Sequence, residues 1–117
     1  MKFNLEKKDI DSALLSLSAV ADKKQTLPVL SNILIKAQEN GLNMLSTDLE
    51  IELEMDVDNV VVEEPGEITI PAKKASDIVK ELPDGNISFS KEEGEKFKIK
   101  TTTGEYKLVT MEASSFP

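Results

Sequence analysis

The sequence predicts an α+β domain in which two amphipathic helices pack on one side of antiparallel sheets. Apolar residues recur at helical spacing over Lys7–Ala21 and again over Ala72–Leu82. Short alternating or β-branched segments, separated by turn residues, surround both helices. On both sides of Pro65-Gly66 the order is one strand, one helix and three strands. This order indicates an internal duplication and therefore a pseudo-twofold domain.

The first half opens with a short strand in residues 1–6, where apolar and polar side chains alternate before the first helix. After Pro28, the run Val29–Ala37 is rich in apolar and β-branched residues and is typical of a strand. Asn40-Gly41 is a strong hairpin signal because both residues tolerate the positive φ angles of a tight turn. Leu42–Ser46 is then the return strand.

Acidic and apolar residues alternate strictly from Asp48 to Asp58. A period of two predicts a strand with one dry and one wet face. The carboxylate row admits a metal site, a field that repels nucleic acid, or a solvated outer face. Neighbouring carboxylates on one strand face lie about 6.6 Å apart, too far to chelate one ion, and nothing supplies the opposed wall of a catalytic pair. We therefore expect a solvated face, with no metal and no catalytic residue.

The second half repeats the order of the first. Ile68 and Ile70 form a strand, and Pro83-Asp84-Gly85 ends the second helix. The last three strands are expected at Asn86–Lys91, Lys96–Thr101 and Tyr106–Met111.

The two halves also align residue by residue. At an offset of 65, Phe3 maps to Ile68 and Ile10 maps to Ala75. The hairpins correspond as well, with residues 32–35 matching 86–89. Any two amphipathic helices can be aligned by chance, but the repeated strand order favours a true duplication.

The composition excludes several classes of protein. The chain has no Cys and no His, which removes disulfides, thiol nucleophiles, the commonest zinc ligands and the commonest general base. No apolar run is long enough for a membrane span or a signal peptide, so we expect a cytoplasmic protein. The net charge is −8, and residues 31–70 hold one Lys and ten acids, net −9. This asymmetry predicts two unlike surfaces.

Six segments together carry a family resemblance. They are Met1-Lys2-Phe3 and residues 26–34, 46–52, 70–74, 82–85 and 115–117. In order, they resemble the first domain of the bacterial replicative sliding clamp, the beta subunit of DNA polymerase III. The resemblance implies a DNA-clamp fold, with 1–117 as the first of three domains and the second and third absent. It also implies a non-catalytic processivity factor of the bacterial cytoplasm, without a cofactor. In that family, a homodimeric ring encircles duplex DNA, slides without sequence specificity and tethers the replicative polymerase.

The resemblance singles out Lys24 and Lys73 as the positions that match DNA-contacting basic residues. The family usually has Arg at the first, and Lys keeps the charge but loses the bidentate fork. Lysine–phosphate contacts are independent of sequence and sensitive to salt, which suits a sliding protein. Weaker candidates lie on or beside the helices, at Lys7, Lys8, Lys23 and Lys80. Ordinary surface solvation is the alternative for every one of these lysines.

The resemblance also implies a ring joint with the third domain of a second protomer. The matching positions are Lys74 and Ile78 on the second helix, with Tyr106 and Leu108 on the last strand. An edge strand offers unpaired backbone groups, so sheet extension across a joint is chemically natural. Core packing is the alternative for Ile78 and Leu108, because Ile78 matches Ala13 on the apolar stripe.

In the family, the polymerase and the clamp loader bind through domains outside this chain. Two rival functions remain open, an acidic protein-interaction module with exposed edge strands and a hydrolase with paired carboxylates. The rivals predict no equivalent domains downstream in the parent gene, whereas the clamp predicts two.

Overall fold

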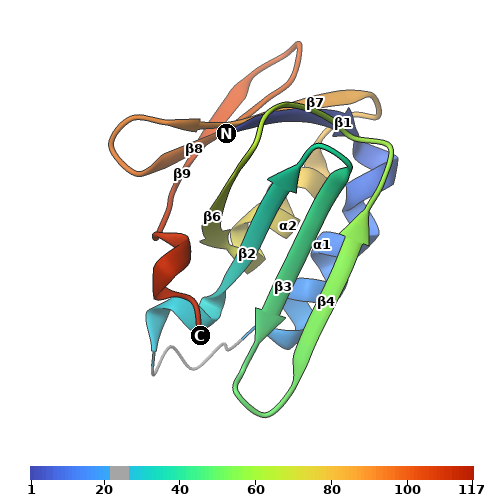
Figure 1. The fold of residues 1–117 in the computed structure, drawn as a ribbon. Helices are drawn as coiled ribbons and strands as arrows, with labels where there is room; N and C mark the ends of the chain where they lie inside the picture. The colour runs from blue at the N-terminus through green and yellow to red at the C-terminus, as the bar shows by residue number, and fades with distance from the viewer. Residues whose placement is uncertain (22–26) are drawn as a thin grey trace.

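Two antiparallel sheets and two helices make up the domain (Figure 1). The computed structural model describes residues 1–21 and 27–117. The first half contains β1 (Lys2–Glu6), α1 (Lys7–Val20), the 3₁₀ turn η1 (Pro28–Ser31), β2 (Asn32–Gln38), β3 (Gly41–Thr47) and β4 (Glu52–Val57). The rest contains β5 (Val61–Glu64), β6 (Gly66–Pro71), α2 (Ala72–Glu81), β7 (Asn86–Glu92), β8 (Lys96–Lys100), β9 (Glu105–Val109) and the 3₁₀ turn η2 (Ala113–Ser115).

The strand order confirms the predicted pseudo-twofold arrangement. One sheet has the order β5-β1-β7-β8-β9, and the other has the order β4-β3-β2-β6. The first strand of each half therefore pairs with the hairpin of the other half. Phe3 lies opposite Phe89, and Ile68 lies opposite Ile35. The pairs that match in the sequence alignment of the two halves thus occupy equivalent register positions.

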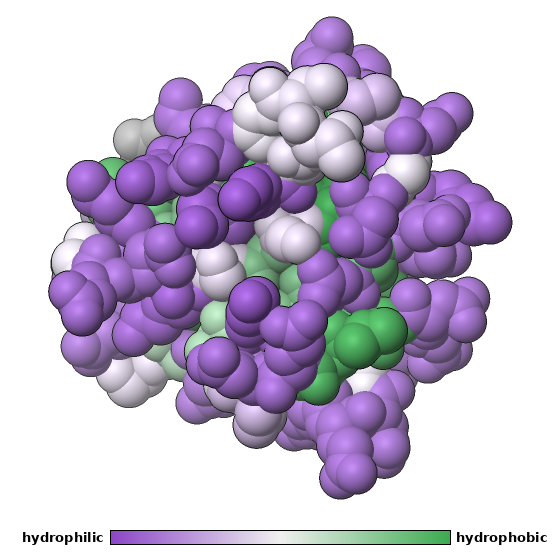
Figure 2. All heavy atoms as spheres, turned by 90° about the horizontal axis from the view of Figure 1, so that it is seen from above, coloured by the Kyte–Doolittle hydropathy of each residue, from purple (hydrophilic) through white to green (hydrophobic). Residues whose placement is uncertain are grey.

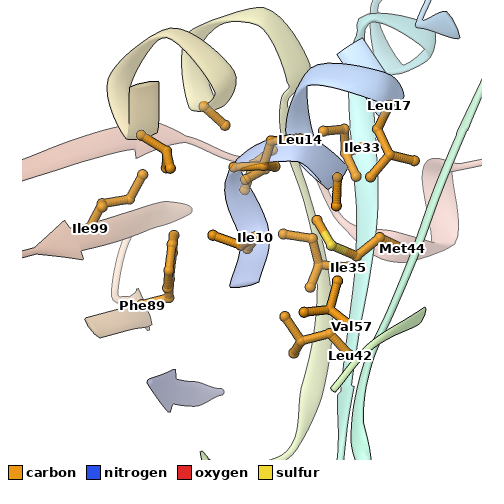
Figure 3. Close-up of a cluster of buried hydrophobic side chains, with 14 of the residues drawn as sticks. Ile10, Leu14, Leu17, Ile33, Ile35, Leu42, Met44, Val57, Phe89 and Ile99 are labelled. Carbon is orange, nitrogen blue, oxygen red and sulfur yellow. The ribbon is translucent and has the colours of Figure 1, made fainter. Parts of the chain in front are cut away.

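One core lies between the helices and the inner faces of both sheets. Ile10, Leu14 and Leu17 of α1 are at most 1% exposed. Figure 3 shows Ile10 and Leu14 between Phe89 and Ile99 of one sheet and residues of β2 and β3 of the other, with Leu17 beside Ile33. Burial of apolar surface in this core is the main contribution to the stability of the fold.

An aromatic cluster fills the part of the core under the five-stranded sheet. The rings of Phe3 and Phe89 stack with their centroids 5.0 Å apart, and Phe97 lies 5.8 Å from Phe89. All three are at most 2% exposed. The alternation predicted for residues 1–6 places Phe3 at this position.

The C-terminal ends of the two helices are satisfied in different ways. The Lys7 ammonium donates to the carbonyl oxygens of Lys80 (2.9 Å) and Leu82 (2.6 Å), at the end of α2. The Ser46 hydroxyl instead donates to the Leu17 carbonyl oxygen (2.8 Å), at the end of α1. The Lys7 contacts thus provide a side-chain donor for carbonyl groups at the end of α2, whereas Ser46 adds a second donor to a carbonyl that also accepts from the Ala21 backbone N–H (3.1 Å).

The predicted strand Val29–Ala37 is wrong in its first part, because residues 28–31 form η1. Val29 and Leu30 are adjacent and are both buried, at 3% and 1% exposure. The tight turn starts at Pro28, whose fixed φ favours it, and allows both side chains to be buried.

The predicted acidic strand is also wrong in its first part, because β4 begins only at Glu52. Asp48 Oδ1 accepts hydrogen bonds from the backbone N–H groups of Glu50 and Ile51, both at 2.9 Å. Leu49 takes a φ of 80°, which closes the turn and interrupts the alternation. Leu49 and Ile51 are consequently 66% and 56% exposed, whereas Val57 at the far end of β4 is buried.

Strand β5 was not predicted. Val61 and Val62 are β-branched, and the short segment pairs with β1 as an edge strand. The Asn40-Gly41 hairpin is confirmed, since β2 and β3 pair across it. Gly41 has a φ of +144°, and a Cβ there would lie 2.8 Å from the Val57 carbonyl oxygen. The remaining predicted elements agree with the structure to within two residues at each end.

Neither of the two described helices is long and apolar enough to cross a membrane.

Candidate nucleic-acid interface and edge groove

Helices α1 and α2 pack side by side, and a groove of about 620 Å³ lies on the surface between them. Its lining includes Leu15, Ser16 and Ser76, together with Lys73. The Lys73 side chain is 80% exposed, and its ammonium lies 3.2 Å from a carboxylate oxygen of Asp77, one turn further along α2. The groove is therefore lined by both polar and apolar residues and carries a cation that solvent can reach.

The other lysine candidates on the helices differ in their surroundings. Lys80 is exposed and lies two turns from Lys73, on the same face of α2. Lys8 is 78% exposed and lies 3.7 Å from Glu6, which makes it a solvated ion pair. The Lys7 ammonium donates hydrogen bonds to carbonyl groups at the end of α2, so Lys7 has a structural role.

The candidates Lys23 and Lys24 lie outside the described residues. Among the described candidates, Lys73 is the exposed lysine that lines the groove between the helices. Sequence reasoning missed Asp77, although its four-residue spacing from Lys73 predicts an ion pair on a helix.

A second groove, of about 550 Å³, lies between α2 and β9. Three of the four predicted joint residues line it, namely Lys74, Ile78 and Leu108. Tyr106 lies on the same strand but outside the groove lining, and it is 42% exposed. Lys107 lines the groove as well and was not predicted.

Core packing, the alternative role for Ile78 and Leu108, applies to both residues at least in part. Leu108 is only 6% exposed and belongs to the main core, and Ile78 packs against that core while half-buried. Both residues nevertheless border the groove. Because β9 is the last strand of its sheet, its outer backbone groups have no strand partner in the described part of the chain.

The acidic row of β4 forms a solvated surface. Glu52, Glu54 and Asp56 are exposed, and the Asn43 amide donates to both Glu54 and Asp56 at 2.9 Å. Within residues 1–21 and 27–117, no three acidic side chains gather closely enough to hold a metal ion. Hydrogen bonds from the backbone of Ile51 and then Glu50 lower the pKa of the nearby Asp48 carboxyl below its usual 3.8.

The outer face of the five-stranded sheet is mostly hydrophilic too, with a few hydrophobic side chains visible, as the view from above shows (Figure 2). Here β8 alternates lysines with buried residues, so that Lys96, Lys98 and Lys100 share the outer face. Lys98 pairs with Glu92 at 3.2 Å. The two sheets thus present outer surfaces of different charge, one with an acidic strand and one with a lysine strand.

The chain is similar to known proteins over its whole length. The family model described as "DNA polymerase III beta subunit, N-terminal domain" matches residues 1–117. The beta sliding clamp of Vibrio cholerae is 37% identical over 120 residues, covering 100% of this chain and 32% of that relative. The chain thus spans about a third of this relative's length.

Solved structures agree in fold. The DNA polymerase III subunit beta from Pseudomonas aeruginosa superposes with a TM-score of 0.94 at 38% identity, covering 100% of this chain and 32% of that one. The Helicobacter pylori beta clamp, solved bound to a DNA ligase peptide, gives a TM-score of 0.93 at 30% identity over the same shares.

Proposed function

The chain belongs to the family of DNA polymerase III beta subunit N-terminal domains, and on that premise we propose that it is the first of three domains in a sliding clamp. The clamp would be a non-catalytic processivity factor that encircles duplex DNA in the bacterial cytoplasm and tethers the replicative polymerase. The match of the family model over residues 1–117, with the same fold as the solved clamps, is the observation that carries this proposal.

The helical face would point to the DNA in such a ring. Lys73 is the described cation best placed to meet a phosphate, because it is exposed at the groove between α1 and α2. Lys80 would add a second charge on the same face of α2. Mobile ammonium groups attract phosphates without reading bases, so the ring could slide. Lys24 remains a proposed contact on the basis of the family resemblance.

The edge groove would form the ring joint. The third domain of a second protomer would extend the sheet beyond β9 and fill the groove bordered by Lys74, Ile78 and Leu108. Tyr106 would contribute from the exposed part of β9. The polymerase and the clamp loader would bind through the other domains of the ring.

A domain exchange tests the proposal. This chain would replace the first domain of the Pseudomonas aeruginosa clamp, whose corresponding region is 38% identical. We expect a dimeric ring that stays on closed circular DNA and slides off linear DNA, because the attachment is topological. A folded exchange protein that neither dimerises nor stays on circular DNA would contradict the proposal.

Two substitutions locate the surfaces in that ring. Lys73→Gln should weaken the binding of a short linear duplex at low salt and leave dimerisation intact. Ile78→Asp should weaken dimerisation, because it places a charge at a half-buried apolar contact. Glu93→Gln, in the β7–β8 turn, serves as a control that should change neither property.

A further inference from the structure

Asp77 lies on α2 between the two candidate surfaces. It lines the groove between the helices with Lys73, and it also lines the edge groove with Lys74. Its carboxylate oxygen Oδ2 lies 3.2 Å from the Lys73 ammonium, and the two side chains are 61% and 80% exposed. The described cation best placed to meet DNA is therefore already in contact with an anion of the protein.

A phosphate and a carboxylate compete for the same ammonium group. A phosphate that approaches Lys73 must displace the Asp77 carboxylate or share the ammonium with it, and it is repelled by the carboxylate in both cases. Exposed ion pairs of this kind contribute little to stability, because water screens them and ordering the side chains costs entropy. The Lys73–Asp77 ion pair thus contributes little to the stability of the fold, but the Asp77 carboxylate directly weakens the attraction between Lys73 and a DNA phosphate.

We propose that Asp77 is an internal competitor that weakens the Lys73–phosphate contact. This inference rests on the proposed function, since it concerns the same helical face. The benefit is a physical one, because a ring that holds DNA topologically needs phosphate contacts that break quickly as it slides. Asp77 reduces the lifetime of the Lys73–phosphate contact, because its carboxylate is a second partner for the Lys73 ammonium at 3.2 Å.

The chain offers a matched control on the same helix. Glu81 is exposed and lies four residues beyond Asp77 on α2. It forms no ion pair with any residue in the described ranges. Asp77→Asn and Glu81→Gln each remove one negative charge from α2. A general effect of net charge would act in both variants, whereas competition at Lys73 would act only in the first.

The test is a titration of the 117-residue chain with a short DNA duplex at low salt, followed by amide NMR shifts. We expect Asp77→Asn to raise the affinity about three- to tenfold, and Glu81→Gln to raise it less. Asp77→Glu, which restores the charge, should return the affinity towards that of the parent chain. When Lys73 is already changed to Gln, adding Asp77→Asn should raise the DNA affinity no more than Glu81→Gln does. Thermal melting checks that every variant remains folded.

The outcomes separate this inference from the proposed function. An Asp77→Asn variant that binds no better than the parent overturns the inference, whatever Lys73 does. Equal gains for Asp77→Asn and Glu81→Gln, or an undiminished gain without Lys73, also overturn it. If Lys73→Gln leaves the binding of a short linear duplex to the exchanged ring unchanged at low salt, the proposed role of this helical face fails instead.

Discussion

The edge strands β4 and β9 occupy equivalent places in the two halves but present different surfaces. Each is the last strand of its own sheet. Val57 lies opposite Leu42 in the first half, and Leu108 lies opposite Phe97 in the second. Val57 and Leu108 are 4% and 6% exposed. The inward positions of the two strands are therefore equivalent in both place and burial.

The outward positions have diverged. Asp56, which precedes Val57, is part of an acidic row, whereas Lys107, which precedes Leu108, lines the edge groove. Inward positions such as those of Val57 and Leu108 require an apolar side chain of suitable volume, because interiors are close-packed. Solvated positions carry no such constraint. In this domain the pseudo-symmetry is preserved by packing, and the proposed functions lie where the symmetry is broken.

The strongest test of the shared core compares Phe89 with its counterpart Ile35. Both lie opposite the first strand of the other half and are at most 2% exposed. Phe89→Ala should lower the free energy of unfolding by about 3–5 kcal/mol, and Ile35→Ala by about 2–5 kcal/mol, because each leaves a cavity. Denaturant titrations followed by circular dichroism and by Tyr106 fluorescence would measure both losses.

Each variant should still unfold in one transition, with both probes coincident, because the two halves share one core. Two separate transitions in either variant would show that the halves are independent units. That result would break the comparison at its strongest point.

A smaller effect is expected where the two helix ends differ. Lys7→Met removes the ammonium that donates to the Lys80 and Leu82 carbonyl groups. We expect a loss of about 1 kcal/mol in the free energy of unfolding, at the low end for charged hydrogen bonds because the site is partly exposed. Lys8→Met is the matched control and should cost less, since Lys8 forms only a solvated pair with Glu6. Equal costs would show that Lys7 is merely a surface cation.

The sequence predicts the repeated parts of this fold well. The start of each helix and the correspondence of residues 32–35 with 86–89 follow from the sequence pattern, whereas their pairing with the first strand of the other half appears only in the structure. Residues 29–31 and 48–51 were predicted wrongly because local turn chemistry overrides the pattern there. At Asp48, a side chain that accepts two backbone hydrogen bonds competes successfully with strand pairing.

The candidate sites were predictable to a lesser degree. The resemblance brought Lys74, Ile78 and Leu108 together, and the structure places them around one groove. The resemblance could not reveal that the Lys7 ammonium donates to carbonyl groups at the end of α2. Lys7 is separated in the sequence from these two partners by 73 and 75 positions. Spacing identifies which residues share a face, but tertiary contacts decide which charges are available.

The acidic row gives a further prediction about the outer surface. Changing Glu50, Glu52 and Glu54 to Gln should increase non-specific DNA binding at β3 and β4 a few-fold at low salt, because the negative field that repels phosphates is reduced. Amide NMR shifts would locate that binding. The control changes Glu93, Glu95 and Glu105 to Gln, which removes the same charge from the β7–β9 region. Unchanged binding at β4, or an equal increase there in the control, would reject a repelling role for the row.

The smallest effect concerns the turn that interrupts the acidic row. Backbone hydrogen bonds from Ile51 and Glu50 lower the pKa of Asp48 in the folded state. A lowered pKa means that the ionised carboxyl stabilises the fold fully at pH values above its pKa in the unfolded chain. That stabilisation is lost as the pH falls through the folded value. Stability curves of the parent chain and of Asp48→Ala, measured from pH 6 down to pH 2, should therefore converge on acidification. A gap between the curves that stays constant with pH would show that the side chain acts through its shape and not through its charge.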